Sequence, residues 1–193
     1  MNPCMNPLEE TIKKQQATAA KVISLLEKQF GNAVVAGGAP RDWFMGKIAR
    51  DIDIYVVVEP KKGGILLAMA TTALDTEVKQ LGKQYEELEQ SMISFITAGS
   101  VWYEHTDHNI IFLNKYQMLH TDDVYTHFDC DICQIKWDKV SGLMPSMQFV
   151  HAQENKTITF NKFEQKHFVK MVHKFGDWKF KFDCTVPDMI KKP

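Results

Sequence analysis

Residues 34–58 read VVAGGAPRDWFMGKIARDIDIYVVV, two apolar runs joined through a pair of glycines. The first run, residues 33–36, predicts a short buried strand, and the second, residues 52–58, predicts a strand rich in β-branched side chains. Between them, Gly37-Gly38 predicts a turn. Residues 40–45 predict a short helix, because proline suits the first turn of a helix. The stretch therefore predicts strand, turn, helix and strand in close succession.

Two aspartates stand at the beginning of the second strand. Asp51 and Asp53 are two residues apart, so their side chains leave the strand on the same face. Two carboxylates this close repel each other, and a divalent cation between them makes the arrangement favourable. Mg²⁺ takes oxygen ligands and keeps substrate phosphates in its shell. We therefore expect Asp51 and Asp53 to form a metal site for phosphoryl or nucleotidyl transfer.

The glycine pair predicts an anion site beside those carboxylates. Glycine lets a phosphate approach the backbone, and a following helix start offers outward-facing amides at Gly37 and Gly38. Arg41 lies in the first turn of the short helix. Its guanidinium can fork onto phosphate oxygens or pair with Asp42, and the sequence leaves both alternatives open.

These residues carry a resemblance to a known family. The segment GGAPRDWFMGKIARDIDIYV resembles the signature of the DNA polymerase β-like nucleotidyltransferase superfamily, and most of all the head domain of CCA-adding enzymes and bacterial poly(A) polymerases. The residues that match the pattern are Gly37, Gly38, Arg41, Asp42, Gly46, Lys47, Asp51 and Asp53. Pro40 replaces the usual apolar residue. The resemblance implies that Gly37 and Gly38 hold the triphosphate of an NTP, and that Asp51 and Asp53 hold Mg²⁺, with two ions expected.

The resemblance also implies a third carboxylate on a neighbouring strand. Residues 127–137, HFDCDICQIKW, read as a strong strand in which Asp129 and Asp131 share a face. One of the two would help to activate the attacking hydroxyl and hold the catalytic metal. The choice between them stays open, as does the alternative of two solvated acids at a strand edge.

A zinc site is the rival interpretation of the same segment. Cys130 and Cys133 form a C-x-x-C pair with histidines nearby in the sequence. In a strand, positions three apart face opposite sides, and neither glycine nor proline marks a turn here. We therefore expect two small thiols in the core and no zinc.

A basic helix is expected over residues 161–175. Four of its basic side chains fall on one helical face: Lys166, Lys170, His173 and Lys174. Such a face suits a triphosphate or an RNA backbone, and we assign Lys170 and Lys174 to nucleotide binding. A solvated helix face remains an equal alternative. The opposite, more apolar face contains Phe163, His167, Met171 and Phe175.

The whole chain fits one domain. It has 193 residues, 45% of them hydrophobic and 24% charged, and a net charge of −1, so no global field draws it onto a polyanion. We expect an α/β (α+β) fold, a nucleotidyltransferase-like mixed sheet flanked by helices. Its parts would be an N-terminal helix (8–30), a catalytic core (31–140), and a C-terminal hairpin and basic helix (145–182). Within the core, further helices are expected at 65–74 and 76–90 and strands at 92–97 and 109–113.

The expected activity is transfer of a nucleoside monophosphate from an NTP to an acceptor hydroxyl. In this family a long helical body follows the head, and too few residues follow the third candidate strand here for us to expect such a body. The acceptor is therefore left open among an RNA end, a protein and a small molecule. Two alternatives stand beside the enzyme: an inactive nucleotide- or partner-binding protein of the same fold, and a zinc-stabilised interaction protein. With no long apolar run and no export signal, we expect no membrane contact and a cytoplasmic protein with reduced cysteines.

Overall fold

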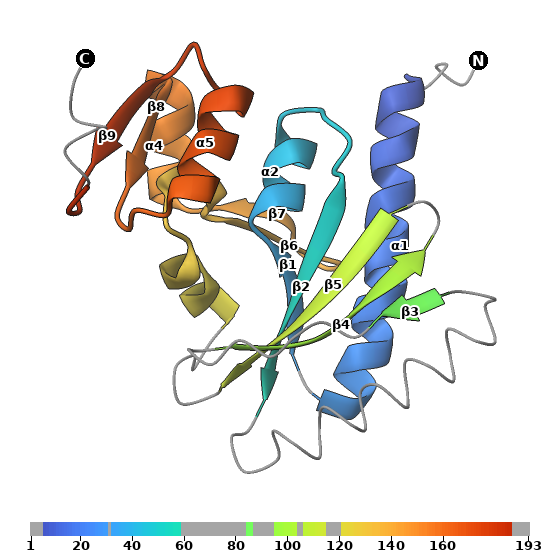
Figure 1. Cartoon of the computed structure of the whole chain (residues 1–193). Helices are drawn as coiled ribbons and strands as arrows, with labels where there is room; N and C mark the ends of the chain where they lie inside the picture. The colour runs from blue at the N-terminus through green and yellow to red at the C-terminus, as the bar shows by residue number, and fades with distance from the viewer. Residues whose placement is uncertain are drawn as a thin grey trace.

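A mixed sheet of seven strands forms the centre of the protein (Figure 1). The computed structural model describes residues 6–30, 32–58, 84–86, 95–103, 106–114 and 121–186. The strands of the large sheet, in spatial order, are β3 (Gln84–Glu86), β4 (Phe95–Tyr103), β5 (Thr106–Asn114), β2 (Asp51–Val58), β1 (Ala33–Ala36), β6 (Ile135–Asp138) and β7 (Gly142–Pro145). β2 and β5 run parallel, and the other neighbours are antiparallel.

Helices and a smaller sheet surround this centre. The helices are α1 (Pro7–Phe30), α2 (Gly38–Phe44), α4 (Met147–Asn155), α5 (Gln165–Lys174) and the 3₁₀ helices η2 (Thr121–His127) and η3 (Asp131–Cys133). The smaller sheet pairs β8 (Thr157–Phe160) with β9 (Lys179–Phe182) in parallel. The α+β class and the mixed sheet flanked by helices are therefore confirmed. No helix in the described ranges is both long and apolar enough to cross a membrane.

The main core lies between α1 and the sheet. Alternate residues of β2 (Ile52, Ile54 and Val56) are fully buried and pack with Ile23 and Leu26 of α1. A strand that sends one face into the core sends the intervening residues to the other face. Asp51 and Asp53 are therefore on the face of β2 that points away from this core.

The local patterns around β2 are confirmed, whereas the middle of the chain is harder to predict. The expected elements at 8–30, 33–36, 40–45, 52–58 and 109–113 appear as α1, β1, α2, β2 and β5, and 92–97 overlaps β4. The helix expected over 76–90 is wrong at Gln84–Glu86, which form β3 against β4. The helix expected over 65–74 lies outside the described residues.

The strand expected over 127–137 is wrong for most of its length. The chain there ends η2, turns through η3 and becomes a strand only at β6. Cys130, Ile132 and Cys133 do not follow the strict two-residue alternation of a strand with one buried face, yet all three are buried in a second core. A 3₁₀ turn satisfies that burial as well as a strand does, because three residues complete one turn.

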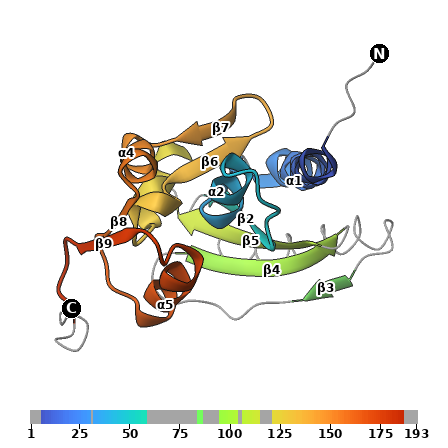
Figure 2. The ribbon, with the colours of Figure 1, turned by 90° about the horizontal axis from the view of Figure 1, so that it is seen from above.

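The hairpin expected after residue 145 is also wrong. Ser146 caps α4, where its Oγ accepts a hydrogen bond of 3.0 Å from the Phe149 amide. β8 then pairs in parallel with β9, across α5. The basic helix expected over 161–175 is confirmed as α5; Met171 of its more apolar face and Phe175, directly after the helix, are buried. These C-terminal elements form a small unit beside α2 and η3 (Figure 2).

Candidate functional site

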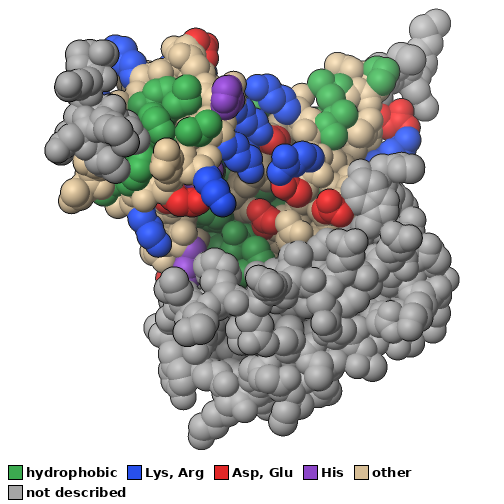
Figure 3. Space-filling view, viewed as in Figure 1, with side chains coloured by type: hydrophobic (Ala, Val, Ile, Leu, Met, Phe, Trp, Pro, Cys, Tyr) green, Lys and Arg blue, Asp and Glu red, His purple; other side chains and the backbone are tan. Residues whose placement is uncertain are grey.

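A cavity of about 290 Å³ lies where α2, β2, η3 and α5 meet. Most of the residues singled out in the sequence line it: Gly37, Gly38, Arg41, Asp42, Asp51, Asp53, Lys170 and Lys174. On the face of the molecule shown in Figure 3, lysine and arginine side chains gather in the middle, with acidic side chains directly beside them. The structure therefore brings the glycine pair, the aspartate pair and the basic helix to one place.

The glycine pair is shaped by a close contact. Gly37 has φ 82°, which favours glycine, and a Cβ there would lie 2.8 Å from Cε1 of Phe128. Its amide donates to the Ile135 carbonyl at 2.9 Å, so it is engaged by the sheet and does not face a ligand. At Gly38 the nearest atom to such a Cβ is Nη2 of Arg41, at 3.8 Å. The open backbone of the pair is thus at Gly38.

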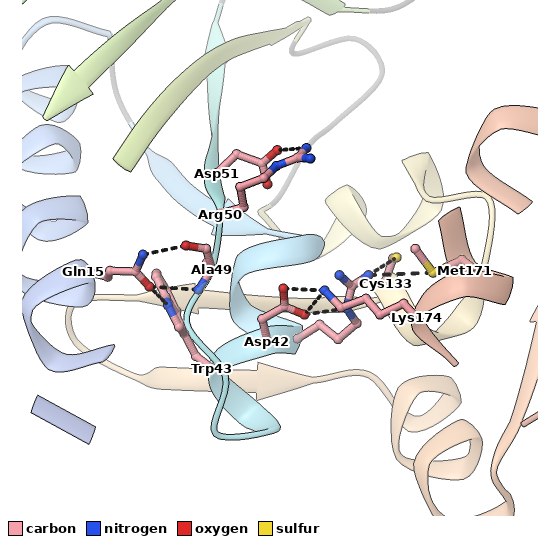
Figure 4. Close-up of polar contacts among 10 residues, drawn as sticks. Gln15, Asp42, Trp43, Ala49, Arg50, Asp51, Cys133, Met171 and Lys174 are labelled. Carbon is pink, nitrogen blue, oxygen red and sulfur yellow. Dashed lines mark hydrogen bonds and ion pairs between the residues drawn. The ribbon is translucent and has the colours of Figure 1, made fainter. Parts of the chain in front are cut away.

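Arg41 pairs with Asp42, the second of the two alternatives. Its Nε donates to Oδ1 of Asp42 at 3.0 Å, and its Nη1 donates to Sγ of Cys133 at 3.3 Å. Lys174 reaches across from α5 and donates to both Asp42 carboxylate oxygens, at 2.7 and 2.6 Å (Figure 4). Asp42 therefore holds two cations at the cavity wall and ties α5 to α2.

The two aspartates of β2 share a face, as expected. Asn109 donates to Oδ1 of Asp53 at 2.8 Å, and the exposed Arg50 donates to Oδ2 of Asp51 at 2.9 Å. Burial raises the pKa of Asp53; the Asn109 hydrogen bond opposes that effect, and the charge of Asp51 adds to it. A cation shared by these carboxylates would relieve both the burial cost and the repulsion, so the donor set fits Mg²⁺.

A further carboxylate stands beside this pair that the sequence did not reveal. In the parallel register of β2 and β5, Asp107 pairs with Asp51 and Asn109 pairs with Asp53. Paired positions of neighbouring strands point to the same face of a sheet. Asp107 is therefore a candidate third acid by its register with Asp51, although it is not itself among the described residues that line the cavity. The sequence signal, an acid just before the strand expected at 109–113, acquires meaning only once β2 and β5 are known to pair.

Asp129 and Asp131 lie elsewhere. Asp129 accepts from Nδ1 of His167, at 2.6 and 2.5 Å from its two oxygens. Oδ2 of Asp131 accepts from the Thr159 amide at 3.0 Å. Because the segment is a 3₁₀ turn and not a strand, the two side chains diverge, and neither is among the described residues that line the cavity.

Cys130, Cys133 and His167 form a compact cluster at the edge of the cavity. The expectation that the two thiols face opposite sides is wrong, because η3 stacks positions three apart, and the sulfurs are 3.6 Å from each other. The hydrogen bond from Cys130 lowers the pKa of Cys133 well below its usual value; burial opposes this, and Arg41 and His167 assist it. Although burial lowers the pKa of His167, Asp129 and Cys133 raise it to about 9.

Comparison with known protein families decides where the chain belongs. The family described as Gabija anti-defense 2 family protein matches residues 5–156. The chain belongs to the Gabija anti-defense 2 family. The region that matches the family includes α2, β2 and η3 and ends before α5. Three residues of α5, His167, Lys170 and Lys174, therefore lie beyond it. Among curated proteins, none matches the chain.

Solved structures of CCA-adding enzymes share the fold of this Gabija anti-defense 2 family member. A CCA-adding enzyme complex with CTP matches at a TM-score of 0.59 and 15% identity over 90% of this chain and 42% of the enzyme. A complex with ATP matches at 0.58 and 16% over 92% and 40%. The Thermotoga maritima enzyme complexed with tRNA matches at 0.57 and 14% over 91% and 42%. The chain spans less than half the length of these enzymes and has a nucleotidyltransferase-like fold.

Proposed function

We propose that this protein is a Mg²⁺-dependent nucleotidyltransferase. One observation carries the proposal: Asp51 and Asp53 line the same cavity as Gly38 and two lysines of α5. Transfer from a nucleoside triphosphate requires carboxylates that hold a metal ion beside basic side chains that hold the phosphates. The reason is that this chemistry depends on positioning and charge stabilisation.

Each wall of the cavity has a distinct role in this proposal. Asp51 and Asp53 hold the metal, with Asp107 on the adjacent strand as the third acid. Bound there, Mg²⁺ would neutralise phosphate charge and make an acceptor hydroxyl easier to deprotonate. Asn109 keeps the Asp53 carboxylate oriented through its 2.8 Å hydrogen bond.

The lysines of α5 supply the charge for the triphosphate. Burial lowers the pKa of Lys174, and the neighbouring Arg41 guanidinium lowers it further, so cations are crowded here. Burial raises the pKa of Asp53, and the positive charge of Lys170 is close enough to oppose part of that effect. A bound polyphosphate would offset this crowding. Lys170 would contact it directly, whereas Lys174 and Arg41, both already engaged by Asp42, would add their charge and hold α5 and α2 together.

Only the comparisons with known proteins bear on the acceptor of the transferred nucleotide. The CCA-adding enzymes of similar fold include one complexed with tRNA, which favours an RNA end. The family description, an anti-defense protein, favours an acceptor that belongs to the Gabija defence. An RNA end, a protein hydroxyl and a small molecule all satisfy the proposed chemistry.

Nucleotide binding without transfer is the second candidate. Arg50 already pairs with Asp51 at 2.9 Å, so one of the two metal ligands has a counter-charge without any metal. In such a protein the nucleotide would bind through the lysines of α5 and would not need the aspartates.

Calorimetric titration with each of the four NTPs tests the proposal. Ca²⁺ replaces Mg²⁺ to prevent turnover, and EDTA removes both. We expect binding that needs the metal and falls below detection in Asp51→Asn/Asp53→Asn, while the exposed Asp177→Asn control binds as the wild type does. Pyrophosphate release with Mg²⁺ and candidate acceptors then separates transfer from binding. Tight NTP binding that is unchanged by EDTA and by the double substitution would overturn the proposal of a metal-dependent enzyme and favour the second candidate.

A further inference from the structure

We propose that Cys130, Cys133 and His167 form a zinc site at the edge of the nucleotide cavity. Nothing in the proposed transfer reaction uses these three side chains as a group. Each offers a ligand atom of the kind zinc prefers, and all three atoms lie within 4.8 Å of one another. Cys130 and Cys133 are buried and His167 is half-buried.

The spacing of the sulfurs fits a tetrahedral ion. Two thiolates about 2.3 Å from zinc at the tetrahedral angle are about 3.8 Å apart. The Sγ atoms of Cys130 and Cys133 are 3.6 Å apart, so a small adjustment admits the ion. The turn that produces this spacing is the first turn of η3, in which the Cys133 amide donates to the Cys130 carbonyl at 3.2 Å.

His167 is oriented as a metal-ligating histidine is. Its Nδ1 is engaged by the Asp129 carboxylate, which leaves Nε2 as the nitrogen that can coordinate. A carboxylate behind a ligating histidine fixes the ring and strengthens it as a ligand. Asp129 would therefore orient His167 as a zinc ligand and would not act together with the aspartates of β2.

Arg41 completes the surroundings of the cluster. Its Nη1 donates to the sulfur of Cys133 at 3.3 Å, the kind of outer contact that stabilises a thiolate ligand. Zinc would therefore join three segments that are distant in sequence: α2 through Arg41, η3 through the cysteines and α5 through His167. Since Cys133 and His167 also line the cavity, the fourth position would face it and take water or a group of the bound ligand.

A cysteine nucleophile is the rival interpretation of the same atoms. Cys133, His167 and Asp129 have the order of a nucleophile, base and orienting acid. Cys133, however, is only 3% exposed, and a second thiol lies against it. Burial and the paired sulfur suit a metal ligand better than a group that must reach a substrate.

Metal analysis of the whole, untagged chain tests the zinc site. We expect about one zinc per chain to survive desalting, and Co²⁺ added to the metal-free protein to give a thiolate-to-cobalt charge-transfer band. Both signals should be lost in Cys133→Ser and in His167→Ala. They should persist in Cys184→Ser, a matched control that removes a free cysteine outside the cluster.

Two results would overturn the zinc site. One is a wild-type chain with no bound zinc, no cobalt band and a Cys133 thiol that iodoacetamide alkylates rapidly. The other is zinc that remains in the Cys130→Ser/Cys133→Ser variant. The measurement is independent of the proposed transfer reaction, because Asp51→Asn/Asp53→Asn removes the proposed Mg²⁺ ligands and should keep its zinc.

Discussion

At the scale of single residues, Asp53 lies in an environment that disfavours its ionised form. Its carboxylate is desolvated and faces Asp51, and both effects raise its pKa. A raised pKa means that the folded protein disfavours the ionised form, so this group lowers the stability of the metal-free chain near neutral pH. A cation bound between the two carboxylates would offset both effects.

Asp53→Asn should therefore stabilise the metal-free protein and abolish metal-dependent nucleotide binding. We expect the free energy of unfolding to rise by an amount on the order of 0.5–1 kcal/mol, a gain typical of replacing a residue selected for function. The hydrogen bond from Asn109 is kept, because the side-chain oxygen of Asn can still accept it. Chemical denaturation in EDTA measures the gain, and Asp177→Asn serves as the control. A loss of stability would show that Asp53 is a structural residue.

Gly37 provides the residue-scale test of the turn. Gly37→Ala should cost about 1–3 kcal/mol, because the new Cβ meets Phe128 at 2.8 Å and the backbone has φ 82°. Gly46→Ala is the matched control: its φ is 66°, but nothing lies within 4 Å of the new Cβ, so only the backbone cost applies. Equal losses of stability in the two variants would contradict a steric role for Phe128.

At the scale of elements, α1 controls the chain that leads into β2. The buried Gln15 donates to the Ala49 carbonyl at 2.7 Å and accepts from the Ala49 amide at 3.0 Å and from Nε1 of Trp43 at 2.9 Å (Figure 4). The loop it holds ends at Arg50, directly before Asp51. One glutamine of α1 thus anchors the approach to the carboxylate pair.

Gln15→Leu should destabilise the protein by about 2–4 kcal/mol, because a leucine of similar size leaves buried amide and indole groups without partners. Thermal or denaturant unfolding measures the loss. The neighbouring Gln16→Leu makes the same chemical change outside this network and should have little effect. A Gln15→Leu variant as stable as Gln16→Leu would mean that other contacts fix the loop.

The sequence predicts those elements whose signals are local. β1, α2 and β2 follow from apolar runs, a glycine pair and a proline that lie within a short stretch. The α4 helix was missed although Ser146 offers a readable cap before it. The predicted strand at 127–137 failed because buried cysteines and isoleucines suit a 3₁₀ turn equally well, and that error hid the convergence of Cys130 and Cys133.

The site was predictable to the same extent. Asp51, Asp53 and the glycine pair were located from motif spacing, and Lys170 and Lys174 from helical periodicity. Asp107 and the His167–Asp129 contact depend on which strands pair and where α5 docks. Those facts are set by contacts between distant residues, which no local pattern records.

At the scale of the whole molecule, the cavity is closed by distant parts of the chain. One wall is α2 and β2, from the first third of the sequence, and the other is α5, which lies beyond the region that matches the family. Lys174–Asp42 and the burial of Met171 and Phe175 hold the two walls together. A ligand that spans the cavity must therefore affect both.

Hydrogen–deuterium exchange should show that coupling directly. We expect Ca²⁺ with the preferred NTP to slow exchange in α2 and α5 together, because an anion held by Lys170 and a metal held by Asp53 fix both walls at once. Lys170→Ala should abolish the protection of α5, while Lys166→Ala should keep it, because Lys166 belongs to the same basic face but is not among the residues that line the cavity. Protection confined to α2, or equal behaviour of the two lysine variants, would mean that α5 contributes surface charge and no part of the nucleotide site.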